Sequence, residues 1–376
     1  MLDLSKYGFT IVQIETKATC NMGCQFCPYP IKKDKESVLE DKSIYKLIDD
    51  ISRSKTSIDY ITFSQFNEPL LDGRRVFDYI SYAKKNGLKT LMVTNALLLN
   101  KQRNIDRIID SGVDYVKLSL QTLDEKTFST VRGVDYDFNK YSKSINTFLS
   151  KVVNTNIDVT IDLAYNFNND KPKFIKNVYK ILGLVMDELS VPSSKEEVYG
   201  HTLNLLLDWS NNNYPFHPNV GQNELRDQIF NSTIFYVGDT SIQLADNINI
   251  KIKPFHYGLK LSEYYPVQNF SCHKEIISVL ASGDVVPCCL DYDGELSMGN
   301  IHNTDFDKIL SRSKDFIDAI RSPDGEKNIV CQRCFGAPTR RGAAIKSIYN
   351  KFSSQTKDNR YLRGNLSNSS SLEVVE

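Results

Sequence analysis

The feature that most constrains the fold is an alternation of short apolar runs with amphipathic segments over the first half of the chain. Strands are predicted at residues 9–14, 60–63, 88–93, 115–120, 157–163 and 187–191. Helices are predicted at residues 42–52, 75–85, 102–111, 141–152 and 174–182. Because repeated strand–helix units build a parallel sheet with right-handed crossovers, we expect an α/β fold, a partial (β/α)6 barrel, over residues 1–191.

The remainder of the chain does not continue this alternation of strands and helices. Residues 192–265 combine polar turns, one helix and strand-like pieces at 234–237 and 248–252, which indicates an insertion or linker. Residues 266–340 contain five of the eight cysteines and are predicted to form a small metal-stapled domain. Residues 341–376 are predicted to form a C-terminal helix followed by a disordered tail.

The composition argues against two classes of partner. The chain has 46 basic and 46 acidic side chains, so it offers no electrostatic footprint for nucleic acid or for an anionic membrane surface. It contains neither a long apolar run of about 18 residues nor a signal-peptide pattern. We therefore expect a cytoplasmic protein, in which eight cysteines indicate metal binding or catalysis rather than disulfides.

The cysteines fall into two separate groups. Cys20, Cys24 and Cys27 lie directly after the first predicted strand, where a β/α fold places its ligands. The second group consists of Cys272, Cys288, Cys289, Cys331 and Cys334. A structural zinc site needs four ligands, whereas three thiolates on a [4Fe–4S] cluster leave one iron open. The first group therefore predicts a cluster that takes part in chemistry, with a zinc or redox loop as the alternative.

The spacing Cys20-x3-Cys24-x2-Cys27, with Phe26 before the last cysteine, resembles that of the radical S-adenosylmethionine (SAM) superfamily. In that family an electron from the cluster cleaves SAM, and the resulting 5′-deoxyadenosyl radical takes a hydrogen atom from the substrate. The resemblance implies three cofactor features: a [4Fe–4S] cluster held by three cysteines, bound SAM, and an electron donor of the flavodoxin or ferredoxin type.

Residues 65–69, Gln-Phe-Asn-Glu-Pro, resemble the glycine-rich GGE-type segment that holds the SAM amino group in this family. Glu68 and Pro69 match that segment, but Phe66 and Asn67 stand where the family has glycines. The alternative for Glu68 is an ordinary surface or salt-bridged carboxylate.

Three further segments match the family in the expected order. Residues 93–96 resemble its TNG turn, residues 118–120 its ribose-binding serine segment, and residues 131–133 its arginine–glycine element. An arginine suits the SAM carboxylate because its guanidinium can donate two parallel hydrogen bonds. The SAM contacts implied by the resemblance are Phe26, Asn67, Glu68, Asn95, Ser119 and Arg132. The alternative for the polar ones is that any β/α fold places polar residues at its strand ends.

The second cysteine group resembles the auxiliary-cluster domain called SPASM, or its shorter twitch form. The resemblance implies one auxiliary [4Fe–4S] cluster held by Cys272, Cys288, Cys331 and Cys334. A full SPASM domain needs three more cysteines after the CxxC motif, and none follows Cys334, so the twitch form fits better. Two cysteines plus a CxxC motif also occur in zinc ribbons, which is the alternative.

Cys289 is the one cysteine of the second group that is not assigned to the auxiliary cluster. Neighbouring residues on a strand point to opposite faces, so Cys289 is predicted to face away from a cluster bound by Cys288. It could donate a hydrogen atom to a substrate radical, as an epimerase requires, or it could be a buried core thiol. Asp291 is a candidate base beside the cluster, although the surrounding sequence also suits a turn.

The reaction that we expect first is a two-electron oxidation of a small polyol, sugar or aminocyclitol, with the auxiliary cluster as electron acceptor. The enzymatic alternatives are ribosomal peptide maturation, forming thioether or carbon–carbon crosslinks, and radical epimerisation through Cys289. The non-enzymatic alternative is a structural iron–sulfur or zinc protein. The substrate, whether a small molecule or a peptide, cannot be predicted because substrate contacts lie on variable loops.

Overall fold

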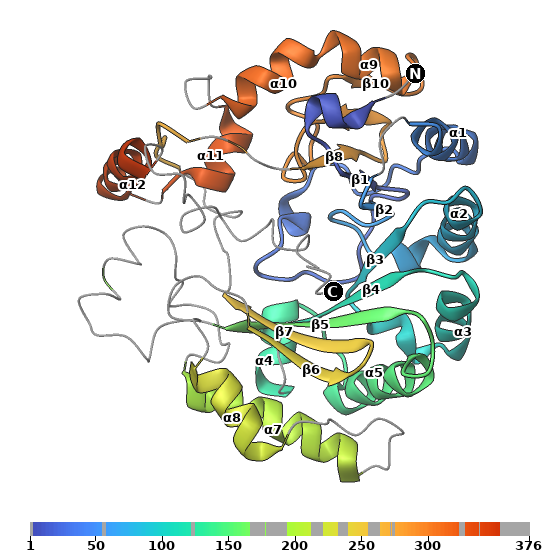
Figure 1. The fold of residues 1–376 in the computed structure, drawn as a ribbon, viewed down its shortest axis with the longest axis vertical. Helices are drawn as coiled ribbons and strands as arrows, with labels where there is room; N and C mark the ends of the chain where they lie inside the picture. The colour runs from blue at the N-terminus through green and yellow to red at the C-terminus, as the bar shows by residue number, and fades with distance from the viewer. Residues whose placement is uncertain are drawn as a thin grey trace, which may run out of the picture.

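A computed structural model describes most of the chain outside the predicted linker and the C-terminal tail. The described residues are 3–54, 58–121, 125–165, 177, 194–211, 221–231, 240–254, 264–270, 272, 275–322, 328–337 and 339–353. Within them, ten strands form a single sheet in the order β10-β9-β8-β1-β2-β3-β4-β5-β7-β6 (Figure 1). The strands are β1 Ile11–Ile14, β2 Tyr60–Thr62, β3 Thr90–Thr94, β4 Tyr115–Gln121, β5 Asp158–Tyr165, β6 Thr240–Ala245, β7 Ile248–Pro254, β8 Ile276–Val279, β9 Asp284–Val286 and β10 Gly299–Asn300.

Strands β1 to β5 pair in parallel in sequence order, which confirms the predicted barrel architecture. Four helices between them cover the outer, convex face of the sheet (Figure 1). These helices are α1 Asp41–Ser52, α2 Arg74–Lys85, α3 Gln102–Asp110 and α5 Phe138–Val152. The short helix α4, Glu125–Arg132, lies between β4 and α5 in the chain. The predicted helix at 174–182, apart from residue 177, and the predicted strand at 187–191 lie outside the described residues.

Burial follows the periodicities that predicted these elements. In α1 the buried side chains are Ile44, Leu47, Ile48 and Ile51, which share one helix face. In β4 the side chains of Val116, Leu118 and Leu120 are buried, whereas Tyr115, Lys117 and Ser119 alternate with them and are partly exposed. The apolar core therefore lies between the sheet and its outer helices, and the other, concave face of the sheet carries polar side chains.

The place beside β5 is taken by β7, which corrects the interpretation of residues 192–265 as an insertion alone. β7 pairs in parallel with β5 and antiparallel with β6, so a hairpin completes this side of the sheet. The alternation of Ile248, Ile250 and Ile252 with polar residues gives β7 one buried face. Asn247, in the hairpin turn, stabilises the position of the hairpin. Its side-chain amide donates hydrogen bonds of 2.8 to 3.2 Å to three backbone oxygens between the end of α5 and the start of β5.

The cysteine-rich C-terminal region also joins this sheet. Strand β8 pairs in parallel with β1, and β9 and β10 extend the sheet antiparallel. The region contains the helices α9 Phe306–Arg312, α10 Lys314–Arg321 and α11 Ile329–Phe335, and the predicted C-terminal helix is α12 Arg340–Ser353. Helices α7 Lys195–Asn211 and α8 Gln222–Asn231 pack together near the β6–β7 hairpin (Figure 1). In the described ranges, none of the helices has the length and apolar character needed to span a bilayer.

Candidate active site

The first cysteine group lies in the loop that leaves the carboxyl end of β1. Cys24 is buried, and Cys20 and Cys27 are partly buried. The Asn95 side-chain amide lies 3.7 Å from the Cys20 sulfur, and the Tyr29 backbone amide lies 3.4 Å from the Cys27 sulfur. Because the carboxyl ends of parallel strands share one edge, the turn after β3 meets the cysteine loop here.

The arginine–glycine element after α4 packs directly against the cysteine loop. Gly133 has a φ of +59°, and a Cβ atom placed on it would lie 2.4 Å from the Gly23 backbone oxygen. The Gln25 backbone amide donates a hydrogen bond of 2.9 Å to the Val131 oxygen. Only glycine fits a left-handed position at so close a backbone approach, so this contact accounts for the glycine in the motif.

Arg132 is fully buried beside the three thiols. Its Nε and one terminal nitrogen, Nη2, are buried without a hydrogen-bond partner, and its guanidinium lies 5.8 Å from the centre of the Phe26 ring. Burial lowers the guanidinium pKa, but nearby Cys24, Tyr141 and Cys20 raise it more, so the net shift is upward. A buried cation with unpaired donors is costly, and these atoms therefore fit an anionic group such as a carboxylate.

Glu68 occupies the buried space between the segment after β2 and the turn after β3. Its carboxylate accepts hydrogen bonds from the Thr94 hydroxyl at 2.7 Å and from the backbone amides of Asn95 and Leu70 at 2.8 and 3.1 Å. Burial raises the Glu68 pKa to about 6, against the lowering effect of these hydrogen bonds. The Glu68 backbone amide also donates to Thr19 in the cysteine loop, at 2.9 Å, so Glu68 joins three loops of the site.

The other predicted SAM contacts lie at the same edge of the sheet. The Asn95 amide donates to Asn21 at 2.8 Å, and its oxygen accepts from Leu97. The Asn67 side-chain oxygen accepts from the Gln65 backbone amide at 2.7 Å, and its side-chain nitrogen is buried without a hydrogen-bond partner. Ser119 is partly exposed on the concave face of β4, between Leu118 and Gln121, where the pairing of β4 with β5 shifts register. Their roles toward SAM stay predictions.

Two thiols of the first group, those of Cys20 and Cys27, are protonated at neutral pH in the metal-free protein. Burial raises the pKa of Cys20 to about 11 and that of Cys27 to about 12. Since iron is bound by thiolate, loading a cluster has to release these protons.

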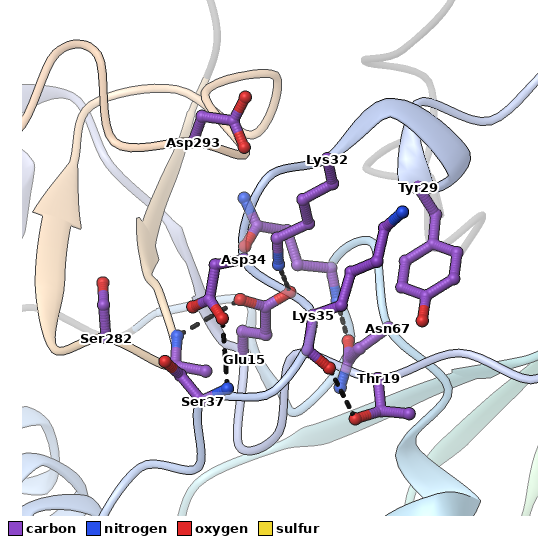
Figure 2. A network of polar contacts seen from close by, with 12 residues as sticks. Glu15, Thr19, Tyr29, Lys32, Asp34, Lys35, Ser37, Asn67, Ser282 and Asp293 are labelled. Carbon is purple, nitrogen blue, oxygen red and sulfur yellow. Dashed lines mark hydrogen bonds and ion pairs between the residues drawn. The ribbon is translucent and has the colours of Figure 1, made fainter.

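A buried ion pair that the sequence did not indicate supports the cysteine loop. Lys32, a few residues after Cys27, reaches Glu15 at the end of β1 (Figure 2). Both side chains are 1% exposed. The other Glu15 oxygen accepts from the Ala281 backbone amide at 3.2 Å, in the turn after β8. Asp293 accepts from the Lys33 backbone amide at 2.9 Å. The cysteine loop is therefore held between β1 and the C-terminal region.

Glu15 and Lys32 were missed because they are 17 residues apart and neither belongs to a motif. The one available signal was the position of Glu15, a carboxylate that directly follows an apolar strand at the ligand-bearing edge.

In the second group, the strand alternation that oriented Cys289 away from a cluster bound by Cys288 does not hold, and the orientation of Cys289 toward such a cluster stays a prediction. The two side chains are within hydrogen-bonding reach of each other, and Cys334 lies close enough to influence Cys288 electrostatically. The strand β9 ends at Val286, so the two cysteines lie in the following turn and strand alternation does not apply to them. The pKa of Cys288 is raised well above that of a free thiol by the hydrogen bond with Cys289 and by burial.

The remaining cysteines lie on elements around this pair. Cys331 and Cys334 are on α11, and both pack in an apolar cluster with Cys288 and Cys289. The Cys272 backbone amide donates to the Arg321 oxygen at 3.3 Å. Within the described ranges, no three His, Cys, Asp or Glu side chains converge as the ligands of a single metal ion would. The complete ligand set of the auxiliary cluster therefore stays a prediction.

Asp291 is fully buried, and both of its carboxylate oxygens are engaged by backbone amides. Its oxygens accept from Glu295 at 2.8 Å and from Leu296 at 2.7 Å. Burial raises the Asp291 pKa, against the lowering effect of these two hydrogen bonds. The geometry favours a role in holding the turn, and the assignment of Asp291 as a base stays a prediction.

An aromatic contact connects the two cysteine regions. Phe66 packs edge-on against Tyr292, with ring centres 5.6 Å apart, and the Arg333 guanidinium lies 5.1 Å from the centre of the Tyr292 ring. Next to Phe66, the Gln65 side-chain amide lies 3.4 Å from the Cys289 backbone oxygen. Phe66, which replaces one of the family glycines, therefore faces the second cysteine region.

Two family models match the chain: the radical SAM superfamily over residues 14–171, and the SPASM iron–sulfur cluster-binding domain over residues 272–335. The chain therefore carries a radical SAM domain, followed by a SPASM domain behind its barrel. The radical SAM domain implies SAM and a [4Fe–4S] cluster as cofactors, and the SPASM domain implies an auxiliary iron–sulfur cluster.

Among curated proteins, an uncharacterized protein of Methanocaldococcus jannaschii is 29% identical over 178 residues, which are 47% of this chain and 55% of that protein. The GTP 3′,8-cyclase of Chlorobaculum tepidum is 28% identical over 179 residues, which are 46% of this chain and 51% of that protein. The chain therefore matches these relatives over about half of their length. A solved structure of BtrN with AdoMet and 2-DOIA is 13% identical, covers 84% of this chain and 88% of its own, and has a TM-score of 0.41.

Proposed function

We propose that this enzyme cleaves SAM reductively and uses the 5′-deoxyadenosyl radical to oxidise a small polyol, sugar or aminocyclitol by two electrons. The observation that carries the proposal is Arg132, a fully buried guanidinium with two unpartnered nitrogens beside the three-cysteine loop. An arginine so placed can hold the SAM carboxylate next to the cluster that Cys20, Cys24 and Cys27 would bind. When bound, that cluster supplies the electron for SAM cleavage.

The protein groups around this position have separable roles. Arg132 orients the SAM carboxylate, and Phe26 lies against the Arg132 guanidinium and contributes the apolar wall for the adenine. Glu68 fixes the turn at Asn95 through the backbone amide, and its negative charge favours the SAM amino group nearby. Ser119 presents a hydroxyl from the concave face of β4 toward the ribose. Together these groups restrict SAM to one orientation, which is the contribution that the protein makes to radical chemistry.

Oxidation is favoured over the alternatives by the contact between the two cysteine regions. Phe66 and Gln65, from the SAM-binding segment, touch Tyr292 and the Cys289 backbone in the SPASM domain. A substrate radical formed beside SAM would therefore lie next to the auxiliary site, where cysteines Cys272, Cys288, Cys331 and Cys334 would hold an acceptor for the second electron. A proton must leave the substrate in the same step.

The proposal is tested by anaerobic reconstitution with iron and sulfide, followed by assay of 5′-deoxyadenosine with SAM and a strong reductant. We expect product from the parent, and none from a variant with alanine at Cys20, Cys24 and Cys27. For Arg132→Met we expect full iron content but SAM binding at least tenfold weaker, because a charge-assisted, bidentate contact is lost. Arg74→Met, at an exposed arginine, is the matched control.

Parent protein that binds zinc instead of iron, or forms no 5′-deoxyadenosine, would contradict the proposed chemistry. Undiminished SAM binding in Arg132→Met would remove the proposed role of Arg132. Turnover that leaves the substrate at its original oxidation level and is abolished by Cys289→Ser would replace oxidation by epimerisation.

A further inference from the structure

We propose that the exposed face of α12 is the docking surface for an acidic one-electron carrier protein of the flavodoxin type, which removes electrons from the auxiliary site. The inference rests on the proposed function and adds the partner that this oxidation requires. It starts from four residues of α12, Arg341, Ile345, Ile348 and Tyr349, called the exposed stripe below. Figure 1 shows α12 at the outer edge of the molecule.

The exposed stripe is continuous because its members follow helical spacing. The side chains of Ile345, Ile348 and Tyr349 are 47%, 58% and 44% exposed. Arg341 is also exposed and lies four residues before Ile345. Residues three and four positions apart are neighbours on a helix surface, so the four side chains form one row. Adjacent exposed apolar side chains bordered by polar groups are typical of interaction sites.

Hydrogen bonds hold the opposite face of α12 against the protein. The Ser347 hydroxyl oxygen accepts from the Gln268 backbone amide at 2.9 Å, and the Asn350 side-chain amide donates to the Gln268 oxygen at 3.2 Å. The Lys346 ammonium donates to the Gly336 backbone oxygen at 3.1 Å, just after α11. These contacts fix the orientation of the helix, so the exposed stripe points to solvent.

The same helix borders the second cysteine group. Ala343 is buried in the apolar cluster that also contains Cys289 and Cys331, and Cys288 and Cys334 pack against that cluster. The thiols thus share one apolar environment, which suits an iron–sulfur cluster held by thiolates. The exposed stripe lies on the far side of a single helix, whose diameter is roughly 10–12 Å. A carrier docked on the stripe therefore comes close to the auxiliary site.

The charge of α12 favours an acidic partner. The helix contains no acidic residue and four basic ones, Arg340, Arg341, Lys346 and Lys351. Within the described residues, neither an ion pair nor a side-chain hydrogen bond engages the exposed Arg341 guanidinium. Flavodoxins are acidic, and complementary charge speeds their encounter with a basic surface and sets the docking orientation. Electron-transfer complexes bury less than about 1,200 Å², an area that one helix face and its surroundings can supply.

The proposed oxidation creates the need for such a partner. Hydrogen abstraction leaves a carbon radical on the substrate, and loss of one electron and one proton converts that carbon to a carbonyl. The electron passes to the auxiliary site and has to be removed before the next turnover. Oxidised flavodoxin takes up this electron and a proton and becomes the neutral semiquinone. One electron therefore enters each turnover at SAM, and one leaves at α12.

The first test is anaerobic titration calorimetry of oxidised flavodoxin with protein in which both clusters are assembled. Ile348→Asp and Arg341→Glu should each raise the Kd at least tenfold, because the first removes the central apolar contact and the second reverses a charge. The matched controls are Phe316→Asp, at a side chain of α10 that is 41% exposed, and Arg74→Glu, at an exposed arginine. Both controls should match the parent.

The second test follows the electron itself. A variant with alanine at Cys20, Cys24 and Cys27, which retains only the auxiliary cluster, is reduced, freed of reductant and mixed with oxidised flavodoxin. Semiquinone should form, and adding Ile348→Asp should slow its formation at least tenfold at flavodoxin concentrations below the Kd. Oxidation by ferricyanide, a small acceptor that needs no docking surface, should proceed at the same rate with and without Ile348→Asp.

Unchanged flavodoxin binding and unchanged semiquinone formation in Ile348→Asp and Arg341→Glu would overturn the proposal. If one of these variants does not fold, the other decides. A parent dimer that becomes a monomer in Ile348→Asp would assign the exposed stripe to a second copy of the chain instead. Binding to phosphatidylserine vesicles that is lost in Ile348→Asp would assign it to a lipid surface. Formation of 5′-deoxyadenosine with a chemical reductant, without any carrier protein, tests the proposed function separately.

Discussion

At the scale of single residues, burial gives Glu68 an acid–base behaviour that surface carboxylates lack. Its pKa is raised from 4.5 to about 6, so the folded protein retains this proton at a pH where the unfolded chain has lost it. The free energy of unfolding must therefore fall as the pH rises from 4.5 through 6. For a fully buried group the contribution is about 2 kcal/mol.

Glu68→Gln should remove this dependence. Urea unfolding of the metal-free protein between pH 4.5 and 7 should show the variant gaining about 2 kcal/mol relative to the parent as the pH rises. Glu125→Gln, at an exposed position, is the control and should keep a constant difference from the parent. A difference between Glu68→Gln and the parent that stays constant with pH would contradict the raised pKa.

Sequence reasoning was most successful for residues that a motif places at a strand end. Glu68 and Asn95 come together with the first cysteine group because parallel strands end at one edge of the sheet. Arg132, the last residue of α4, reaches the same place through the contact of Gly133 with Gly23. The strand alternation used to orient Cys289 does not apply, because the apolar pattern does not reveal that β9 ends at Val286. Lys32 was missed because its partner is fixed by tertiary contacts.

At the scale of elements, the contact between the cysteine loop and the turn after α4 depends on Gly133. Gly133→Ala should destabilise the protein by at least about 2 kcal/mol, because the new methyl group adds a backbone clash with Gly23 to the strain of a left-handed residue. Urea unfolding measures the loss, and iron content after reconstitution should fall as the cysteine loop shifts.

Gly87→Ala is the matched control, since Gly87 has a φ of +77° with open space around it. Gly87→Ala should lower the free energy of unfolding by about 1 kcal/mol, from the strain of a left-handed residue alone. The iron content after reconstitution should be normal. Equal losses in the two alanine variants would show that the close approach to Gly23 is not important for stability.

The strands and helices of the barrel could be predicted because each carries its own periodicity, as the buried stripe of α1 does. The position of β7 could not be predicted, because a long segment separates β7 from β5 in the chain. Only the hydrogen bonding between strands decides which strand lies beside β5. The same holds for β8, whose short apolar run gives no indication that it pairs with β1.

At the scale of the whole molecule, the Glu15–Lys32 pair joins the barrel, the cysteine loop and the SPASM domain. Glu15→Gln or Lys32→Met alone leaves one buried charge unpaired and should cost about 3–5 kcal/mol in the free energy of unfolding. The double variant should lose less than the sum of the single ones, because neither charge then remains.

These single and double variants form a double-mutant cycle, and the exposed pair Lys151–Asp106 is its control. The coupling energy between Lys151 and Asp106 should stay below about 1 kcal/mol. Additive losses for Glu15→Gln and Lys32→Met would mean that the two charges do not depend on each other.

The pairing of β8 with β1 also has a consequence for synthesis of the chain. Ile11 pairs with Ile276, so 265 residues must be translated after Ile11 before its partner is complete (276 − 11). At ribosomal rates that interval lasts roughly 13–53 s, during which one backbone edge of β1 has no partner. An unpaired strand edge is a template for aggregation, so the nascent chain is vulnerable for most of its translation, and a chaperone that shields β1 would act in this interval.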